Sequence, residues 1–206
     1  MSKPVILLGA GGHAGVLLDA LNLNGVEVLG YVAPKQAIEE IELKYLGNDE
    51  YVTKLSADEI ELANSVGGLT LDRRECLYDD FKALGYRFAQ VIHPSAVVSD
   101  SATLGEGVQI MAGAVVQAGV SLADNVIINT RASVDHDCFV NRHCHIAAGA
   151  VLAGNIHVGE KTLIGAGATV IQGIAIGPDC IVGAGAVVIS DVGASEKVVG
   201  VPARKL

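Results

Sequence analysis

The chain has 206 residues, 50% of them hydrophobic, which is enough to bury a core in one large domain or two small ones. Its formal net charge of -9 excludes proteins that wrap nucleic acid or dock on anionic membranes, because both depend on a basic surface. We therefore expect a small-molecule ligand, with neither nucleic acid nor a membrane as partner.

The cysteines and the apolar runs predict the cellular compartment. The four cysteines form no C-x-x-C pair, and no apolar run reaches the length of a membrane span. The N-terminus lacks the charged, then apolar, then small-residue order of a signal peptide. These features predict a cytoplasmic protein with free, mostly buried thiols.

Residues 4–32 predict a strand, a helix and a second strand. "PVILLGAGG" is an apolar run that ends in a glycine-rich turn, and "VEVLGYV" is the second strand. The stretch between them has apolar residues at helical spacing. They are Val16, Leu17, Ala20 and Leu21. Such a start places backbone N–H groups and a helix N-terminus where a phosphate can sit, and Gly11, Gly12 and His13 are the candidates for binding a nucleotide diphosphate there.

The same turn also matches part of an NAD fingerprint, Gly9-x-Gly11-x-x-Ala14. That fingerprint needs an acidic residue at the end of the second strand, whereas this strand ends in Ala33 and Pro34. NAD is therefore not expected. Two interpretations remain open: a nucleotide-sugar diphosphate site, or glycines that serve only the packing of helix on strand.

A polar, acidic segment follows, from Glu39 to Glu61. After it, "SVGGLTLDRRECLYDDFKALGYRFAQVIHPSA" predicts a third strand, a helix and a fourth strand that continues into the next domain. The apolar face of this helix is expected to carry Leu77, Phe81 and Leu84. The pattern predicts an α/β domain over residues 1–90 and a second domain over residues 91–206.

From Ile92 to Val187 the chain repeats every six residues, giving 16 hexads without an insertion. The first position of every hexad is Ile, Leu or Val, and the fifth is usually small or compact. This pattern resembles the hexapeptide repeat of the left-handed parallel β-helix. Each hexad supplies a short strand and a corner, so three hexads close a triangular coil, and successive coils lie about 4.7 to 4.9 Å apart.

Three of the six histidines fall within ten positions of this repeat, at His136, His143 and His145. A purely structural solenoid remains an alternative, because the repeat by itself carries no chemistry. A zinc hydratase of the same fold is a second alternative, but the spacing of two coils between ligands that such enzymes use does not occur here. We therefore expect no metal.

Five segments, in this order over the whole chain, resemble those of bacterial nucleotide-sugar acyltransferases: "GAGGHAGVLLDAL", "VIHPSA", "IINTRASVDHDC", "HCHIAAGAVLAGN" and "GVPARKL". That family comprises sialic acid O-acetyltransferases and N-acetyltransferases of nucleotide-linked 4-amino-4,6-dideoxy sugars. The resemblance implies a Rossmann-like nucleotide-sugar-binding domain, a β-helix that binds acetyl-CoA, and a homotrimer with active sites between subunits. It also implies a place in polysaccharide biosynthesis.

The resemblance also implies roles for individual residues. His136 is similar to the general base, and Asp137 to the carboxylate that orients it. Gly154 matches the backbone amide placed at the thioester oxygen, and His145 the histidine near substrate and acetyl group. The CoA wall is implied at Gly165, Ala166 and Ala184, with Arg204 and Lys205 near the CoA phosphates.

The repeat supports part of this transfer by arithmetic alone. Gly154 follows His136 by 18 residues, one full coil, so the two should stack at one corner. His145 is half a coil away from His136, so the two can share a pocket only if a second subunit packs alongside. Cys138 and Cys144 hold inward fifth positions, so we interpret them as core residues and expect direct transfer without an acyl-enzyme.

We favour an amine acceptor, because a dedicated nucleotide-binding domain suits a nucleotide-linked sugar better than a free one. Sialic acid O-acetylation is the first alternative, and a noncatalytic trimer that binds nucleotide sugars is an alternative of another class. Relatives commonly carry acidic residues after the second strand, where this sequence has "GYVAPKQ", so the nucleoside stays open.

Overall fold

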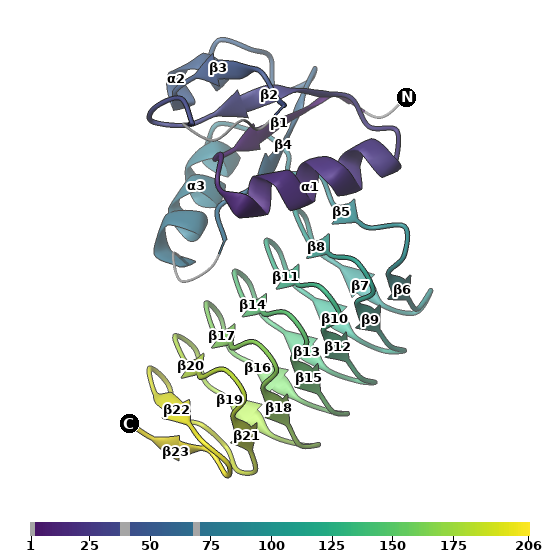
Figure 1. The fold of residues 1–206 in the computed structure, drawn as a ribbon, viewed down its shortest axis with the longest axis vertical. Coiled ribbons are helices and arrows are strands. Elements are labelled where there is room, and N and C mark those ends of the chain that lie inside the picture. The colour runs from purple at the N-terminus through teal and green to yellow at the C-terminus, as the bar shows by residue number, and fades with distance from the viewer. Residues whose placement is uncertain (1–2, 38–41, 68–70) are drawn as a thin grey trace. The chain divides into compact units, whose positions relative to one another are not determined.

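The computed structural model describes residues 3–37, 42–67 and 71–206 (Figure 1). The chain divides into two compact units, residues 1–94 and residues 95–206. The separation into domains after residue 90 stays a prediction. No helix among the described residues has both the length and the apolar character needed to cross a membrane.

The first unit is built on a four-stranded parallel sheet with the strand order β3-β2-β1-β4. Its elements are β1 (Val5–Leu8), α1 (Gly12–Leu23), β2 (Val28–Val32), β3 (Tyr45–Gly47), α2 (Asp49–Val52), β4 (Glu61–Asn64), α3 (Leu71–Ala83) and β5 (Val91–Ile92). One face of the sheet buries Ile6, Leu8 and Leu62 against Tyr78 and Phe81 of α3. The expected strand–helix–strand start is confirmed by β1, α1 and β2.

Three details of this unit differ from the sequence analysis. The third strand, β4, comes before Ser65 rather than after it, and the predicted strand partly falls on residues 68–70, outside the described chain. Val16 is 42% exposed because α1 turns Ala14 toward the core instead. Leu84 is 58% exposed because α3 ends one residue earlier, and Tyr78 joins Phe81 on its buried face.

Arg74 is fully buried on α3 and ties that helix to the end of β4. Its Nη1 donates to the carbonyl oxygens of Asn64, at 2.6 Å, and Val66, at 2.8 Å. In return, Asn64 Nδ2 donates to the Arg74 carbonyl at 2.8 Å. Burial lowers the pKa of Arg74 to about 9, so the guanidinium keeps its charge at neutral pH. This clamp fixes the loop that follows β4.

We expect Arg74→Met to lower the free energy of unfolding of the first unit by about 2 to 4 kcal/mol, because one buried and one partly buried carbonyl lose a charged donor. Differential scanning calorimetry would resolve the transition of that unit. Arg87→Met, at an exposed arginine of the same unit, is the matched control. Equal transition temperatures for the two variants would show that the clamp contributes nothing to stability.

The second unit is a left-handed parallel β-helix of very short strands. The repeating strands are β6 (Val97–Val98), β7 (Thr103–Leu104), β8 (Gln109–Ile110), β9 (Val115–Val116), β10 (Ser121–Leu122), β11 (Ile127–Ile128), β12 (Ser133–Val134), β13 (Phe139–Val140), β14 (His145–Ile146), β15 (Val151–Leu152), β16 (His157–Val158), β17 (Leu163–Ile164), β18 (Thr169–Val170), β19 (Ala175–Ile176), β20 (Ile181–Val182) and β21 (Val187–Val188). An antiparallel pair, β22 (Lys197–Val199) and β23 (Arg204–Lys205), ends the chain. The predicted fold is confirmed.

Three sheets form the sides of the coil. The β12 sheet holds β6, β9, β12, β15, β18 and β21; the β13 sheet holds β7, β10, β13, β16 and β19; the β14 sheet includes β8, β11, β14, β17 and β20. Each strand pairs with the strand one coil away, so Ser133 lies opposite Val151 and Val134 opposite Leu152. A residue therefore stacks on the residue 18 positions later.

The corners of the coil use two kinds of backbone position. The fourth residue of each hexad from 107 to 185 has a positive φ, whether it is glycine or, as at Asp137 (φ 58°), another residue. The second residue often lies against the next coil, where a Cβ on Gly165 would come 2.6 Å from the Ala184 nitrogen. Glycines at the second position are therefore needed for the close approach of neighbouring coils, whereas glycines at the fourth position adopt a positive φ.

Candidate active site

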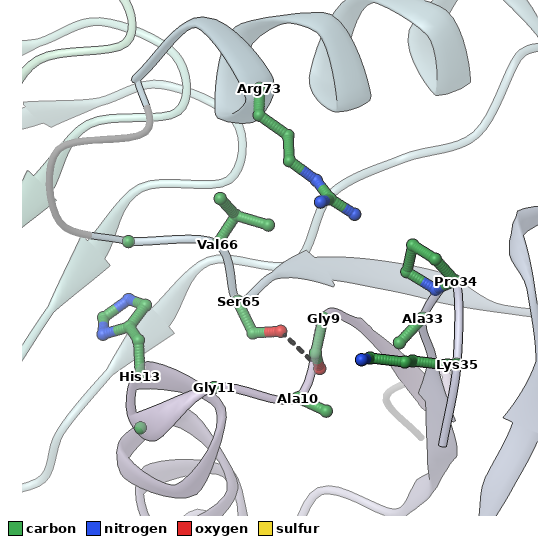
Figure 2. A pocket seen from close by; sticks show the side chains of 12 residues that line it. Gly9, Ala10, Gly11, His13, Ala33, Pro34, Lys35, Ser65, Val66 and Arg73 are labelled. Carbon is green, nitrogen blue, oxygen red and sulfur yellow. Dashed lines mark hydrogen bonds between the residues drawn. The ribbon is translucent and has the colours of Figure 1, made fainter. Parts of the chain in front are cut away.

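The first candidate region is a pocket of about 750 Å³ in the α/β unit (Figure 2). Its floor is the turn between β1 and the start of α1, which contains Gly11, Gly12 and His13. The loop after β4 forms another side, where Ser65 Oγ contacts the carbonyl oxygens of Leu8 at 2.8 Å and Gly9 at 2.9 Å. The structure thus brings together the three residues assigned to a diphosphate.

The polar side chains of this pocket include two cations that the sequence analysis did not assign. Lys35 follows β2, and Arg73 lies in the first turn of α3. In Figure 2 both side chains extend toward the space above the β1–α1 turn. No carboxylate occurs among the described residues that line the pocket.

The second region is the corner between β12 and β13, which carries His136 and Asp137. The His136 side chain is 61% exposed, so a ligand can reach it. Its Nδ1 lies 2.9 Å from Asp137 Oδ2, and its backbone N–H donates to Asp135 Oδ1 at 2.7 Å. The left-handed backbone of Asp137 allows this contact between adjacent residues, because it turns the carboxylate back toward the ring.

Gly154 lies under the His136 ring on the next coil, as the spacing of 18 residues predicts. A Cβ at Gly154 would come 2.5 Å from both His136 Cε1 and His136 Nε2. The Gly154 carbonyl accepts from the Gly173 N–H at 3.0 Å, whereas its own N–H has no protein acceptor among the described residues. The corner therefore presents an imidazole and a backbone donor side by side.

The hydrogen bond to Asp137 determines which nitrogen of His136 can take up a proton. An ionised carboxylate only accepts, so neutral His136 carries its proton on Nδ1 and leaves the lone pair on Nε2. The hydrogen bond to Asp137, together with the negative charges of Asp135 and Asp137, raises the pKa of His136. A raised pKa makes the ring a stronger base.

The remaining predicted site residues lie elsewhere on the coil. His145 is in β14, where Asn129 Nδ2 contacts its Nε2 at 3.0 Å. Because Asn129 Oδ1 accepts from the Thr130 N–H, the amide nitrogen donates to His145 Nε2 and the neutral ring carries its proton on Nδ1. Within one chain, His145 and His136 are on different sides of the coil.

The residues assigned to the CoA wall stack at a third location. Gly165 and Ala166 lie between β17 and β18, and Ala184 lies between β20 and β21. The Gly185 N–H donates to the Ala166 carbonyl at 2.9 Å, which holds the two coils together. This corner joins the β14 sheet to the β12 sheet, whereas His136 lies where the β12 sheet meets the β13 sheet.

The cysteines near the site are buried thiols. Cys138 Sγ donates to the Ala153 carbonyl at 3.0 Å, and Cys144 Sγ to the Gly159 carbonyl at 3.0 Å. Burial raises the pKa of Cys138, and raises that of Cys144 to about 12. Both groups are therefore protonated at neutral pH and poor nucleophiles, in keeping with direct transfer.

One further residue of the corner could have been found from the sequence. A Cβ at Gly119 would come 2.6 Å from Asp137 Oδ1, so the carboxylate lies over this glycine. Gly119 precedes Asp137 by one coil, the same spacing that relates Gly154 to His136. By contrast, Lys35 and Arg73 come from separate elements, and no local pattern marks them.

Two family models match the chain. The PglD N-terminal domain matches residues 4–79, and the bacterial transferase hexapeptide of six repeats matches residues 155–190. The first match covers most of the α/β unit with its pocket, and the second covers the part of the β-helix that begins directly after Gly154.

Solved structures resemble the whole chain. The acetyltransferase domain of PglB from Neisseria gonorrhoeae is 35% identical, with all of both chains covered and a TM-score of 0.95, and has also been solved with acetyl coenzyme A. PerB from Caulobacter crescentus, in complex with CoA and GDP-perosamine, is 38% identical. That alignment covers 100% of this chain and 98% of PerB, with a TM-score of 0.93.

Proposed function

The chain belongs to the PglD-type nucleotide-sugar N-acetyltransferases with hexapeptide repeats, and we propose that it acetylates the 4-amino group of a nucleotide-linked 4-amino-4,6-dideoxy sugar by direct transfer from acetyl-CoA, with His136 as general base. As a member of this family it is an acetyl-CoA-dependent enzyme that uses a nucleotide-linked 4-amino sugar. The observation that carries the residue assignment is the stack of His136, Asp137 and Gly154 at one corner.

The proposed reaction needs one base and one donor. The sugar nitrogen attacks the thioester carbonyl, and His136 Nε2 takes the proton that this nitrogen loses. The new C–N bond forms, the C–S bond breaks, and the proton passes from His136 to the sulfur of CoA. Asp137 stabilises the imidazolium in between, through its hydrogen bond to Nδ1.

The Gly154 N–H is proposed to bind the oxygen on which negative charge develops. A backbone donor is suited to this role because it is held in place before the reaction starts. The carbonyl of the same residue is bound to Gly173, which fixes the orientation of the peptide. Its place beneath His136 supports the assignment, since the base must reach the attacking nitrogen and the donor the carbonyl oxygen, and both atoms are bonded to the same carbon in the intermediate.

We further propose a homotrimer with active sites between subunits. His145 and the wall of Gly165, Ala166 and Ala184 lie on other sides of the coil than His136. A second subunit that brings its own His145 and wall to the corner of His136 would let one ligand contact both sets. Closed rings are the usual outcome of such self-association.

A thiol-release assay tests the proposed function. Purified protein and acetyl-CoA would be challenged with UDP-, dTDP- and GDP-linked 4-amino-4,6-dideoxy sugars and, separately, with free sialic acid. Rapid CoA release with one nucleotide sugar is expected. Release with sialic acid alone would favour O-acetylation, and binding of nucleotide sugars without any release would favour the noncatalytic alternative.

The raised pKa of His136 predicts an acid limb in the pH profile. Since the neutral ring is the base, kcat/KM should fall as the pH drops through a pKa above the ordinary 6.5. Asp137→Asn removes the main cause of the shift and should move this limb to lower pH. Steady-state rates of wild type and variant across the pH range would measure it. A limb that stays in place would mean that another group controls the rate.

A further inference from the structure

The peptide unit that joins Ala153 to Gly154 carries the N–H proposed to bind the developing oxyanion, at the corner between β15 and β16 (Figure 1). Among the described residues, the cis peptide bond is at Val201–Pro202, so the peptide at this corner is trans. In a trans peptide the C=O and the N–H point in opposite directions. Whatever holds the Ala153 carbonyl therefore also sets the direction of the Gly154 N–H.

The Ala153 carbonyl is held by the thiol of Cys138. Its Sγ donates to this oxygen at 3.0 Å and accepts from the Ile156 N–H at 3.4 Å. Within the described chain, no other group hydrogen-bonds to the Ala153 carbonyl, and none accepts from the Gly154 N–H. Cys138 is 1% exposed, so its thiol lies inside the coil. The thiol thus draws the carbonyl inward and leaves the N–H of the same peptide directed away from the interior.

The thiol can act as a donor throughout the reaction because it stays protonated. Burial raises the pKa of Cys138, so Sγ keeps its hydrogen at neutral pH. A hydrogen bond to the carbonyl oxygen also draws electron density along the peptide, which makes the N–H on its other side a stronger donor. The bond from Cys138 therefore both orients and polarises the peptide, although the side chain is closed off from any ligand.

The same arrangement occurs at two other corners, which shows that a hydroxyl can replace the thiol. Cys144 Sγ donates to the Gly159 carbonyl at 3.0 Å, and Thr162 Oγ1 donates to the Gly177 carbonyl at 2.8 Å. In both pairs, as in the pair described above, the acceptor follows the donor by 15 residues. Only the bond from Cys138 holds a peptide whose N–H is assigned to the reaction.

We propose that Cys138 is a positioning residue for acetyl transfer, whose thiol holds the Ala153–Gly154 peptide so that the Gly154 N–H faces the thioester oxygen as negative charge develops there. This inference rests on the proposed function, because it takes Gly154 as the oxyanion donor. No covalent bond to Sγ forms or breaks, and the transfer from acetyl-CoA to the sugar nitrogen stays direct. Two positions along the chain thus separate the base, His136, from the residue that orients the donor.

Steady-state thiol release by variants of Cys138 tests this role. Cys138→Ala should lower kcat about 10-fold, less than the about 10²- to 10³-fold usual when an oxyanion donor is removed outright, because the N–H remains but loses its anchor. Both KM values should stay close to those of the wild type, since neither substrate touches the thiol. Cys138→Ser should restore most of the rate, as the hydroxyl of Thr162 holds its own carbonyl. The acid limb of the pH profile should not move, because the bond between His136 and Asp137 is intact.

Cys144→Ala and Cys144→Ser are the matched controls, because Cys144 makes the same bond at the corner between β16 and β17, away from the assigned residues. Thermal melting should show a similar loss of stability for the two alanine variants, whereas only Cys138→Ala should slow thiol release. Equal losses of rate would overturn the proposal by assigning the effect to general damage to the coil. A Cys138→Ser variant as slow as Cys138→Ala would also overturn it, because the donor would then not be the property that matters.

The remaining outcomes separate this inference from the proposed function. If the wild type acetylates a nucleotide sugar and Cys138→Ala keeps the full rate, the positioning role is wrong and the proposed function stands. The wild type with acetyl-CoA but no acceptor should release no burst of CoA. A burst that disappears in Cys138→Ala would make Cys138 a nucleophile and overturn both direct transfer and the positioning role. If no nucleotide sugar is acetylated at all, the proposed function fails, and this inference fails with it.

Discussion

Replacement of His136 by asparagine is expected to lower kcat by about 10²- to 10⁴-fold, the contribution usual for a general base. Asparagine can still fill the corner and hydrogen-bond to Asp137, but it offers no lone pair of comparable basicity in place of Nε2. CoA binding should persist, because the change removes neither the backbone of the corner nor its stacking on the next coil. Thiol release at saturating substrates measures kcat, and titration with CoA measures binding.

His157→Asn is the control for this experiment. His157 lies in β16 of the same β-helix, is exposed, and contacts the ring of Phe139 at 6.3 Å between ring centroids. The variant should keep nearly the rate of the wild type. Near-normal turnover of His136→Asn would remove His136 from the mechanism and return the noncatalytic trimer to consideration.

Gly154→Ala should be nearly as harmful, although it adds only a methyl group. The new Cβ would lie 2.5 Å from His136 Cε1 and Nε2, so the ring must move away from its position. The backbone of Gly154 is not in the left-handed region, so alanine imposes no strain there, and the ring that moves is the exposed end of a side chain. We therefore expect normal thermal stability together with a loss of about 10²-fold in kcat. Displacement of a catalytic base by about 1 Å is enough to lower the rate by about this factor.

Two comparisons separate displacement of the ring from damage to the fold. Gly15→Ala places a methyl group where no atom lies within 4 Å and should leave both stability and rate unchanged. The double variant His136→Asn, Gly154→Ala should be about as slow as His136→Asn alone, because both changes act on the same ring. Losses that add in full would show that Gly154 acts independently of His136.

The β-helix and its corner could be predicted because the repeat has a fixed period. Once the hexads are aligned, a separation of 18 residues means contact, and this places Gly154 beneath His136 without any knowledge of tertiary structure. The same rule would have given Gly119 beneath Asp137. In a solenoid, proximity follows from counting along the chain.

Fewer features of the α/β unit could be predicted from the sequence, because no fixed spacing relates residues of its different elements. The short β3 and α2 lie in the polar segment, where neither alternation nor helical spacing stands out over three or four residues. Arg74 is buried although arginine is usually exposed, because two carbonyls at the end of β4 accept from it. Lys35 and Arg73 meet in one pocket only after the sheet has formed.

The exact stacking of coils also restricts how such a chain can change in length. Each coil contributes a rise of about 4.8 Å and repeats the same sides and corners. Adding or removing three hexads therefore moves the later coils along the axis by the rise of one coil and does not rotate them. A change of one or two residues between positions 136 and 154 would break the spacing of 18 and separate His136 from Gly154. The β-helix can therefore gain or lose whole coils of 18 residues and keep its remaining corners aligned.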